Sequence, residues 1–166
     1  MMNAIFKRTS VRKYTEQKIE PEKTELLLRA AMAAPSACNQ QPWEFYLTEN
    51  REKMLELSRC SRYATPTAGA ALAIVPCYKK EGLIAPDYAE IDLSACVENL
   101  LLEAEELGLG AVWMGIAPGR DRMENVRRVL NISDDLEPFA IIAVGYPATE
   151  NKQQDRFDPA RIHVVE

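Results

Sequence analysis

The segment spanning residues 88–107 is the sequence feature that most limits what this chain can fold into. It predicts one long helix whose apolar residues cover most of the circumference: Ile91, Leu93, Ala95, Val97, Leu100, Leu101, Leu102 and Ala104. A helix that is apolar nearly all round is buried nearly all round. The chain has 166 residues, about the length of one domain, and such a domain rarely encloses a helix alone. We therefore expect a partner subunit to cover one side of this helix.

Patterns on either side of this helix predict that helices and strands alternate along a single domain, residues 1–166. The alternation of residue types at 43–47 predicts a strand with one buried face, whereas the continuous apolar run at 70–78 is typical of a central strand. The polar, proline-containing segment 147–166 is expected to form an extended tail across a surface or a partner. Further helices are expected at 3–7, 21–34, 51–59 and 121–130, and further strands at 111–114 and 139–146.

The charge balance argues against two classes of partner. Twenty Lys and Arg stand against 25 Asp and Glu, a net charge of −5, whereas a nucleic-acid-binding domain is basic. The same balance disfavours docking on anionic lipid. The longest apolar runs, 70–75 and 139–144, are far short of the roughly 20 residues of a membrane helix, and the N-terminus lacks the apolar region of a secretory signal. We expect no nucleic-acid or membrane partner and a cytoplasmic location.

Cysteine and histidine are too sparse for most side-chain chemistry. Cys38, Cys60, Cys77 and Cys96 form no C-x-x-C pair and are expected to be small buried hydrophobes. His163 is the single histidine and lies three residues from the end, so we expect neither a metal site nor a catalytic triad. The carboxylates are expected on solvated helix faces. No catalytic side chain is predicted, and a bound cofactor would have to supply the reactivity.

Common nucleotide-binding signatures are missing. The sequence has no G-x-x-x-x-G-K-[ST] motif. The G-L-G at 108–110 lies between a predicted helix and a strand, the reverse of the order that a dinucleotide fingerprint requires. A Rossmann or P-loop fold is therefore excluded.

Three other segments could hold a ligand. Arg8, Ser10 and Arg12 would point the same way in an extended segment, and two guanidinium groups with a hydroxyl can bind one phosphate. The loop at 34–42 offers neutral donors and acceptors that suit a heteroaromatic ring or a polyol. A strand that ends at Gly115 allows close approach of a flat ligand. Each segment alone also fits a structural role, as a solvated basic patch, a turn or a strand end.

Taken together and in this order, these segments resemble the flavin-dependent nitroreductase family over nearly the whole chain. The shared motifs are R-x-S-x-R at 8–12, A-P-S-A-C-N-Q-Q-P-W at 34–43, the helix at 92–102 with the following L-G-L-G-A-V-W, and V-G-Y-P at 144–147. The resemblance implies an α+β fold, with a central, mostly antiparallel sheet flanked by helices, in an intertwined homodimer. It also implies FMN bound at the interface.

The resemblance implies roles for four groups of residues. The phosphate and ribityl chain of FMN would be held by Arg8, Thr9, Ser10 and Arg12, and Arg161 of the tail would return to the phosphate. The partner subunit would supply Pro35, Ser36, Ala37 and Asn39 from the loop. The isoalloxazine would lie along Met114, Gly115 and Ile116, with a backbone N–H near N5.

The implied activity is transfer of a hydride from NAD(P)H, as co-substrate, to FMN and then to a small organic acceptor such as a nitroaromatic or a quinone, in a ping-pong cycle. Two alternatives stay open. One is a specialised flavin enzyme, such as a dehalogenase or a flavin-fragmenting enzyme. The other is a flavin-binding or flavin-sequestering protein, or a degenerate dimer without turnover.

This sequence departs from the family pattern in two places. Residues 81–90 are short where many members insert helices that cover the flavin, which leaves substrate selection open. The segment 60–69 lacks a clear counterpart of the polar side chain that many members place near the flavin ring. Arg59, Arg62, Tyr63 and Thr65 are candidates for that role, and none is assigned.

Overall fold

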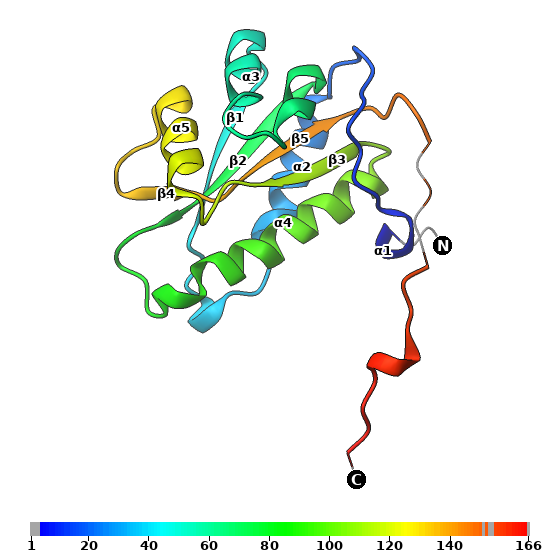
Figure 1. The fold of residues 1–166 in the computed structure, drawn as a ribbon, viewed down its shortest axis with the longest axis vertical. Coiled ribbons are helices and arrows are strands. Elements are labelled where there is room, and N and C mark those ends of the chain that lie inside the picture. The colour runs from blue at the N-terminus through cyan, green and yellow to red at the C-terminus, as the bar shows by residue number, and fades with distance from the viewer. Residues whose placement is uncertain (1–3, 151, 153–154, 166) are drawn as a thin grey trace.

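A five-stranded antiparallel sheet lies at the centre of the fold (Figure 1). The computed structural model describes residues 4–150, 152 and 155–165. The path through the sheet is β1-β2-β5-β3, and the short β4 pairs with β2. All named strand pairs are antiparallel, which confirms the mostly antiparallel sheet that the family resemblance implies. The strands are β1 (Trp43–Thr48), β2 (Leu72–Lys79), β3 (Gly110–Gly115), β4 (Leu136–Pro138) and β5 (Ala140–Gly145).

Helices cover both faces of the sheet. Along β2, Leu72 and Ile74 pack into the core formed with α2 and α4, whereas Ala73 and Val75 pack into the core formed with α3 and α5. This two-sided burial explains why the central strands read as continuous apolar runs. No helix among the described residues is both long and apolar enough to cross a membrane. The helices are α1 (Ala4–Lys7), α2 (Pro21–Met32), α3 (Arg51–Leu57), α4 (Ala89–Glu106) and α5 (Arg120–Leu130).

The expected elements are present, with differences at their ends and at the sheet edge. Helix α2 ends at Met32, two residues before the expected end, and α3 ends at Leu57. The sequence does not predict β4, which has three residues and includes a proline. The expected buried face of β1 is buried only at its start, because β1 is an edge strand: Trp43 is buried and Leu47 is 39% exposed.

Helix α4 is not buried all round by its own chain. One side packs on the sheet through side chains such as Leu93, Val97 and Leu100, which are fully buried. Ile91 is 61% exposed, and Ala95 is only partly buried. The single chain therefore leaves open a stripe of the helix that the sequence expects a partner to cover.

The N-terminal segment docks along the sheet. Val11 N–H donates to Ala111 O of β3 at 3.0 Å. The hydroxyl oxygen of Tyr14 lies 2.6 Å from Val11 O and 3.0 Å from Ala143 O of β5. Burial raises the pKa of Tyr14 well above its ordinary value, so this hydroxyl stays a neutral donor. These bonds fix the segment against the edge of β3.

Gly110→Ala should loosen this docking. A Cβ at position 110 would lie 2.6–2.7 Å from side-chain atoms of Val11, closer than real carbon atoms approach. Overpacking of this kind lowers the free energy of unfolding by about 1–3 kcal/mol, measurable by urea denaturation. Gly69→Ala is the matched control, because a Cβ there has no atom within 4 Å, and its effect should stay within about 0.5 kcal/mol. Equal effects of the two substitutions would contradict the expected close contact.

Candidate functional site

Strand β3 forms one edge of the sheet, and the N-terminal segment covers only the start of that edge. Ser10 lies beside Ala111 in a parallel bridge, and Ala111 O accepts from Val11. Backbone groups of an antiparallel strand alternate in direction, so those of Trp113 and Gly115 also face away from β5. Gly115 lies four residues beyond Ala111, or about 13 Å along the strand. Beyond the bridge between Ser10 and Ala111, this edge of β3 has no paired strand among the described residues as far as Gly115.

Arg8 and Arg12 lie near the start of this edge but make different contacts. Arg8 Nε lies 3.4 Å from a carboxylate oxygen of Glu98 on α4, and the Arg8 side chain is 19% exposed. Arg12 is exposed and donates to Ser10 O at 3.2 Å. The prediction that Arg8, Ser10 and Arg12 point the same way holds only in part. Arg8 N–H donates to Ala4 O, which continues the turn of α1, so the segment becomes extended only after Arg8.

Thr9 lines a hollow next to the N-terminal segment. That hollow has a volume of about 280 Å³ and is also lined by Lys7, Glu105 and Pro147. It therefore lies between the N-terminal segment, the last turn of α4 and the first residues of the tail. The single chain places Thr9 near the start of the tail.

A buried carboxylate attaches the loop at 34–42 to α4. Asp92 is 4% exposed; one of its oxygens accepts from Ala37 N–H at 2.9 Å and the other from Gln40 Nε2 at 2.7 Å. The Gln40 side chain also bonds to both backbone groups of Ala85, each at 2.9 Å. The expectation that the carboxylates are solvated is wrong for Asp92. The signal that could have revealed it is an acidic residue within a helix that is apolar nearly all round.

The backbone of this loop is strained. Cys38, Asn39 and Gln41 have φ values of 51°, 52° and 45°, in the left-handed region that non-glycine residues rarely adopt. Ser36 supports the turn, because its hydroxyl accepts from Gln41 N–H at 3.0 Å. Strained backbone of this kind concentrates at ligand-binding sites. Pro35, Cys38 and Asn39 are exposed, so the loop presents them to a neighbouring molecule.

At the end of β3, only Gly115 is open to a ligand. The side chains of Met114 and Ile116 are 4% and 0% exposed and pack in the core on the α3 and α5 face. The N–H groups of Ile116 and Ala117 both donate to Phe139 O. Gly115 is exposed, and a Cβ built on it would have no atom closer than 4.0 Å. Met114 and Ile116 therefore offer a ligand neither a side chain nor a free N–H group, because the backbone of Met114 pairs with β5 and Ile116 N–H already donates to Phe139 O.

Arg122 also lies at this end of the strand and was not predicted from the sequence. Its Nη1 donates to Gly115 O at 3.4 Å. Arg122 belongs to the first turn of α5, and the helix brings it back to the end of β3. Nothing in the local sequence around Arg122 indicates this contact.

The tail holds Arg161 away from the rest of the chain. Figure 1 shows the C-terminal segment extending from the body of the fold, and all its described residues from Pro147 onward are exposed. Arg161 Nε lies 3.2 Å from Asp158. Apolar side chains of the tail are also uncovered; Phe157 is 75% exposed. The single chain does not bring Arg161 to Arg8.

No contact of the described residues places a polar side chain of segment 59–69 at the edge of β3. Arg62 stacks on the ring of Tyr63 at 4.6 Å, and both residues are exposed. The hydroxyl of Thr67 is buried and has no hydrogen-bond partner in the part of the chain that is described. Thr65 is exposed, and Arg59 lines a groove between α3 and α5.

Comparison with known proteins identifies a family. The profile of the nitroreductase family matches residues 5–81 and 58–146 of this chain. The two matches together include the N-terminal segment, the strained loop, α4 and β3. They leave the tail outside the matched region.

Individual relatives match nearly the whole chain. A candidate NADH dehydrogenase/NAD(P)H nitroreductase of Methanothermobacter thermautotrophicus is 38% identical over 164 residues, which cover 99% of this chain and 86% of the relative. The crystal structure of a candidate NADH oxidase from Clostridium acetobutylicum is 48% identical, with a TM-score of 0.95 over 98% of this chain and 99% of that one. An FMN-dependent nitroreductase from Clostridium difficile is 30% identical, with a TM-score of 0.91 over 100% of this chain and 99% of that one. These similarities confirm the predicted α+β fold.

Asp92→Asn should loosen the strained loop. An amide accepts only through its single oxygen, so either Ala37 N–H or Gln40 Nε2 loses its acceptor. An unsatisfied buried donor costs about 1–3 kcal/mol. We expect a matching fall in the free energy of unfolding and faster hydrogen exchange at the Ala37 amide. Asp87→Asn, at an exposed position, should change neither, and equal exchange rates in the two variants would contradict this role for Asp92.

Proposed function

The chain belongs to the nitroreductase family, and on this premise we propose that it is an FMN-dependent oxidoreductase that uses NAD(P)H to reduce a small organic acceptor, such as a nitroaromatic or a quinone. The observation that carries the proposal is the open edge of β3, which has cationic side chains near one end and an exposed glycine at the other. Bound FMN would supply the hydride-accepting ring that the side chains lack.

The order of the residues along this edge supports the proposal. Arg8, Thr9, Ser10 and Arg12 would hold the phosphate and ribityl chain, because guanidinium groups and hydroxyls form charge-assisted bonds to phosphate. About 13 Å of strand separates Ala111, beside Ser10, from Gly115, a span comparable to that between the phosphate and the ring system of FMN. Gly115 would donate its outward N–H to the ring.

We further propose that the working unit is a homodimer with FMN at the interface. The partner would supply Pro35, Ser36, Ala37 and Asn39 from the strained loop, and Arg161 would reach the phosphate through the tail. Two observations support this: the tail of one chain is exposed along its described length, and α4 leaves an apolar stripe around Ile91 uncovered. An exposed apolar stripe and a protruding tail are both features of chains that associate by exchanging terminal segments.

The proposed roles of the protein are binding, orientation and charge compensation. The guanidinium of Arg12 would offset phosphate charge, whereas Arg8 would also have to loosen its pairing with Glu98. The N–H of Gly115 would favour negative charge that develops on the ring during reduction. Solvent water can supply the proton, so no side-chain acid is required. All four cysteines are free, which suits a reducing compartment such as the cytoplasm.

The activity can be tested by anaerobic bleaching of the purified protein. We expect a yellow protein that NADH or NADPH bleaches and that a nitroaromatic or a quinone re-oxidises. Arg8→Ala/Arg12→Ala should weaken FMN binding by about 3 kcal/mol or more, because each charge-assisted bond contributes about 1.5–3 kcal/mol. Fluorescence quenching of added FMN measures this affinity.

The matched control is Arg29→Ala, which removes an exposed arginine from α2 that pairs only with Glu25 among the described residues. It should leave FMN affinity unchanged. A double variant that binds FMN as tightly as the native protein would contradict the phosphate roles of Arg8 and Arg12. A native protein that gains no colour with FMN would support a degenerate dimer, and one that binds FMN but is not bleached would support a flavin-sequestering protein.

The dimer can be tested at the open stripe of α4. Ile91→Glu alters a side chain that is 61% exposed in one chain, so folding should be little affected. At a dimer interface, the new charge would lose water without a partner and dissociate the dimer. Sedimentation velocity should show a native dimer and a monomeric Ile91→Glu variant. Leu55→Glu, at a position that is 45% exposed on α3, should remain dimeric; a monomeric native protein would contradict the proposal.

A further inference from the structure

Arg8, which is proposed to bind the phosphate of FMN, already faces an acidic side chain of its own chain. Arg8 Nε lies 3.4 Å from a carboxylate oxygen of Glu98 on α4, and neither side chain has another ion-pair partner among the described residues. The Arg8 side chain is mostly covered, whereas that of Glu98 is 48% exposed. A phosphate that reaches Arg8 therefore meets a guanidinium whose charge is already partly offset.

The contact between Arg8 and Glu98 is an ion pair that a phosphate can displace. Its separation of 3.4 Å is longer than the roughly 2.7–2.9 Å of a charge-assisted N–H···O hydrogen bond. Partly exposed ion pairs of this kind contribute little to stability. A phosphate monoester carries almost two negative charges near neutral pH, whereas Glu98 carries one. Arg8 can therefore leave Glu98 for the phosphate, but the pair opposes this exchange.

Two further carboxylates of α4 lie against the N-terminal segment. Glu106 Oε1 accepts from Ala4 N–H at 3.2 Å, and Glu105 lines the hollow that Thr9 also lines. The phosphate-binding residues thus lie beside an acidic stretch of helix. Glu98 is the member of this stretch that pairs with a proposed phosphate-binding residue, so its charge acts most directly on a phosphate at Arg8.

We propose that Glu98 competes with the phosphate of FMN for Arg8, which weakens FMN binding and keeps the bound cofactor exchangeable. This inference rests on the proposed FMN site. When Arg8 binds the phosphate, Glu98 loses its cationic partner and two negatively charged groups share one guanidinium. Both effects oppose binding. Glu98 acts through Arg8 and is therefore a positioning residue that limits the affinity for the cofactor.

Calorimetric titration of the purified full-length protein, freed of flavin, tests this proposal with FMN and with riboflavin, which lacks the phosphate. Glu98→Gln keeps the size of the side chain and removes its charge. It should bind FMN about threefold more tightly than the native protein, or better, because a partly exposed ion pair contributes an amount of this order. Riboflavin should bind equally to both proteins. Loss of a merely structural contact would weaken FMN binding, so the sign of the change distinguishes the two roles.

A double variant tests whether Glu98 acts through Arg8. In an Arg8→Gln background the pair is already lost, so adding Glu98→Gln should improve FMN affinity by a clearly smaller factor than it does in the native background. An equal improvement in both backgrounds would overturn the competition for Arg8.

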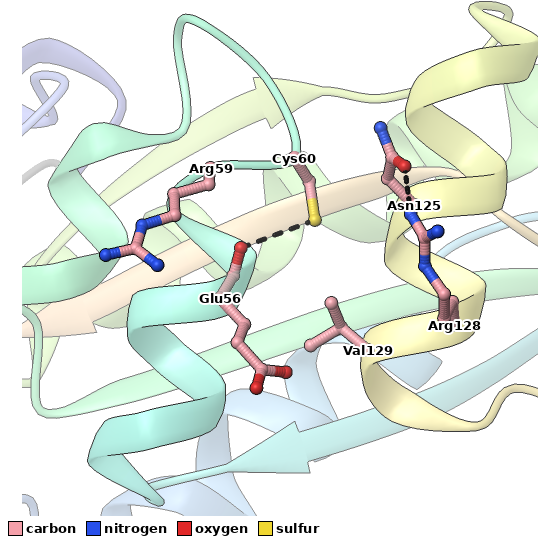
Figure 2. Close-up of a pocket in the computed structure, with 6 residues that line it drawn as sticks. All are labelled: Glu56, Arg59, Cys60, Asn125, Arg128 and Val129. Carbon is pink, nitrogen blue, oxygen red and sulfur yellow. Dashed lines mark hydrogen bonds between the residues drawn. The ribbon is translucent and has the colours of Figure 1, made fainter.

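Glu56→Gln is the matched control. Glu56 lines the groove between α3 and α5 (Figure 2), and its carboxylate also lies 3.4 Å from a cation, Lys53 Nζ. The substitution removes the same charge on the face of the sheet opposite α4 and should leave FMN affinity unchanged. Thermal unfolding verifies that each variant is folded.

Three results would overturn this inference alone: Glu98→Gln binds FMN no more tightly than the native protein does, riboflavin binding improves as much as FMN binding, or Glu56→Gln improves FMN binding equally. Failure of both the native protein and Glu98→Gln to bind FMN would overturn the proposed function together with this inference.

Discussion

The burial of β2 and β5 on both faces is the constraint on which the rest of the structure depends. Alternate residues of β2, such as Ile74 and Val75, enter two separate cores. Two layers of helices must therefore cover the sheet, and the remaining strands, β1 and β3, become its edges. The unpaired backbone groups of an edge strand are available for other partners. Because residues 10–11 pair only with the start of β3, the free edge as far as Gly115 becomes the proposed cofactor site.

Helix α4 links this edge to the strained loop. Its apolar side packs on the sheet, while Asp92 holds the loop at Ala37 and Gln40, and Glu98 holds Arg8. Asp92 is tolerated in the core because both carboxylate oxygens accept hydrogen bonds, which offset the loss of water. The same helix leaves the stripe around Ile91 uncovered. Helix α4 thus positions both the loop and Arg8 of the proposed site. It also carries the surface that is proposed to bind the second subunit.

Most of the fold could be predicted from the sequence, because helices and strands have different periods of apolar residues. The long helix, the central strands and their order along the chain follow from those periods alone. The exact ends of α2 and α3 do not, since the last turn of a helix depends on local caps and packing. The strand Leu136–Pro138 is too short to show a period, and its pairing with β2 depends on contacts about 60 residues apart.

For the candidate site, the sequence by itself determined which residue types lie in which segment: arginines and hydroxyls near the N-terminus, amides in the loop and a glycine at the end of a strand. Only the tertiary structure decided which of them face outward. Packing of the sheet against α3 and α5 buries Met114 and Ile116, whereas Gly115 between them is exposed. Packing on α4 directs Arg8 to Glu98 and buries Asp92. Local sequence patterns indicate which side chains are buried, because apolar residues recur with the period of each helix or strand. The direction in which a polar side chain points depends instead on neighbours that are distant in the sequence.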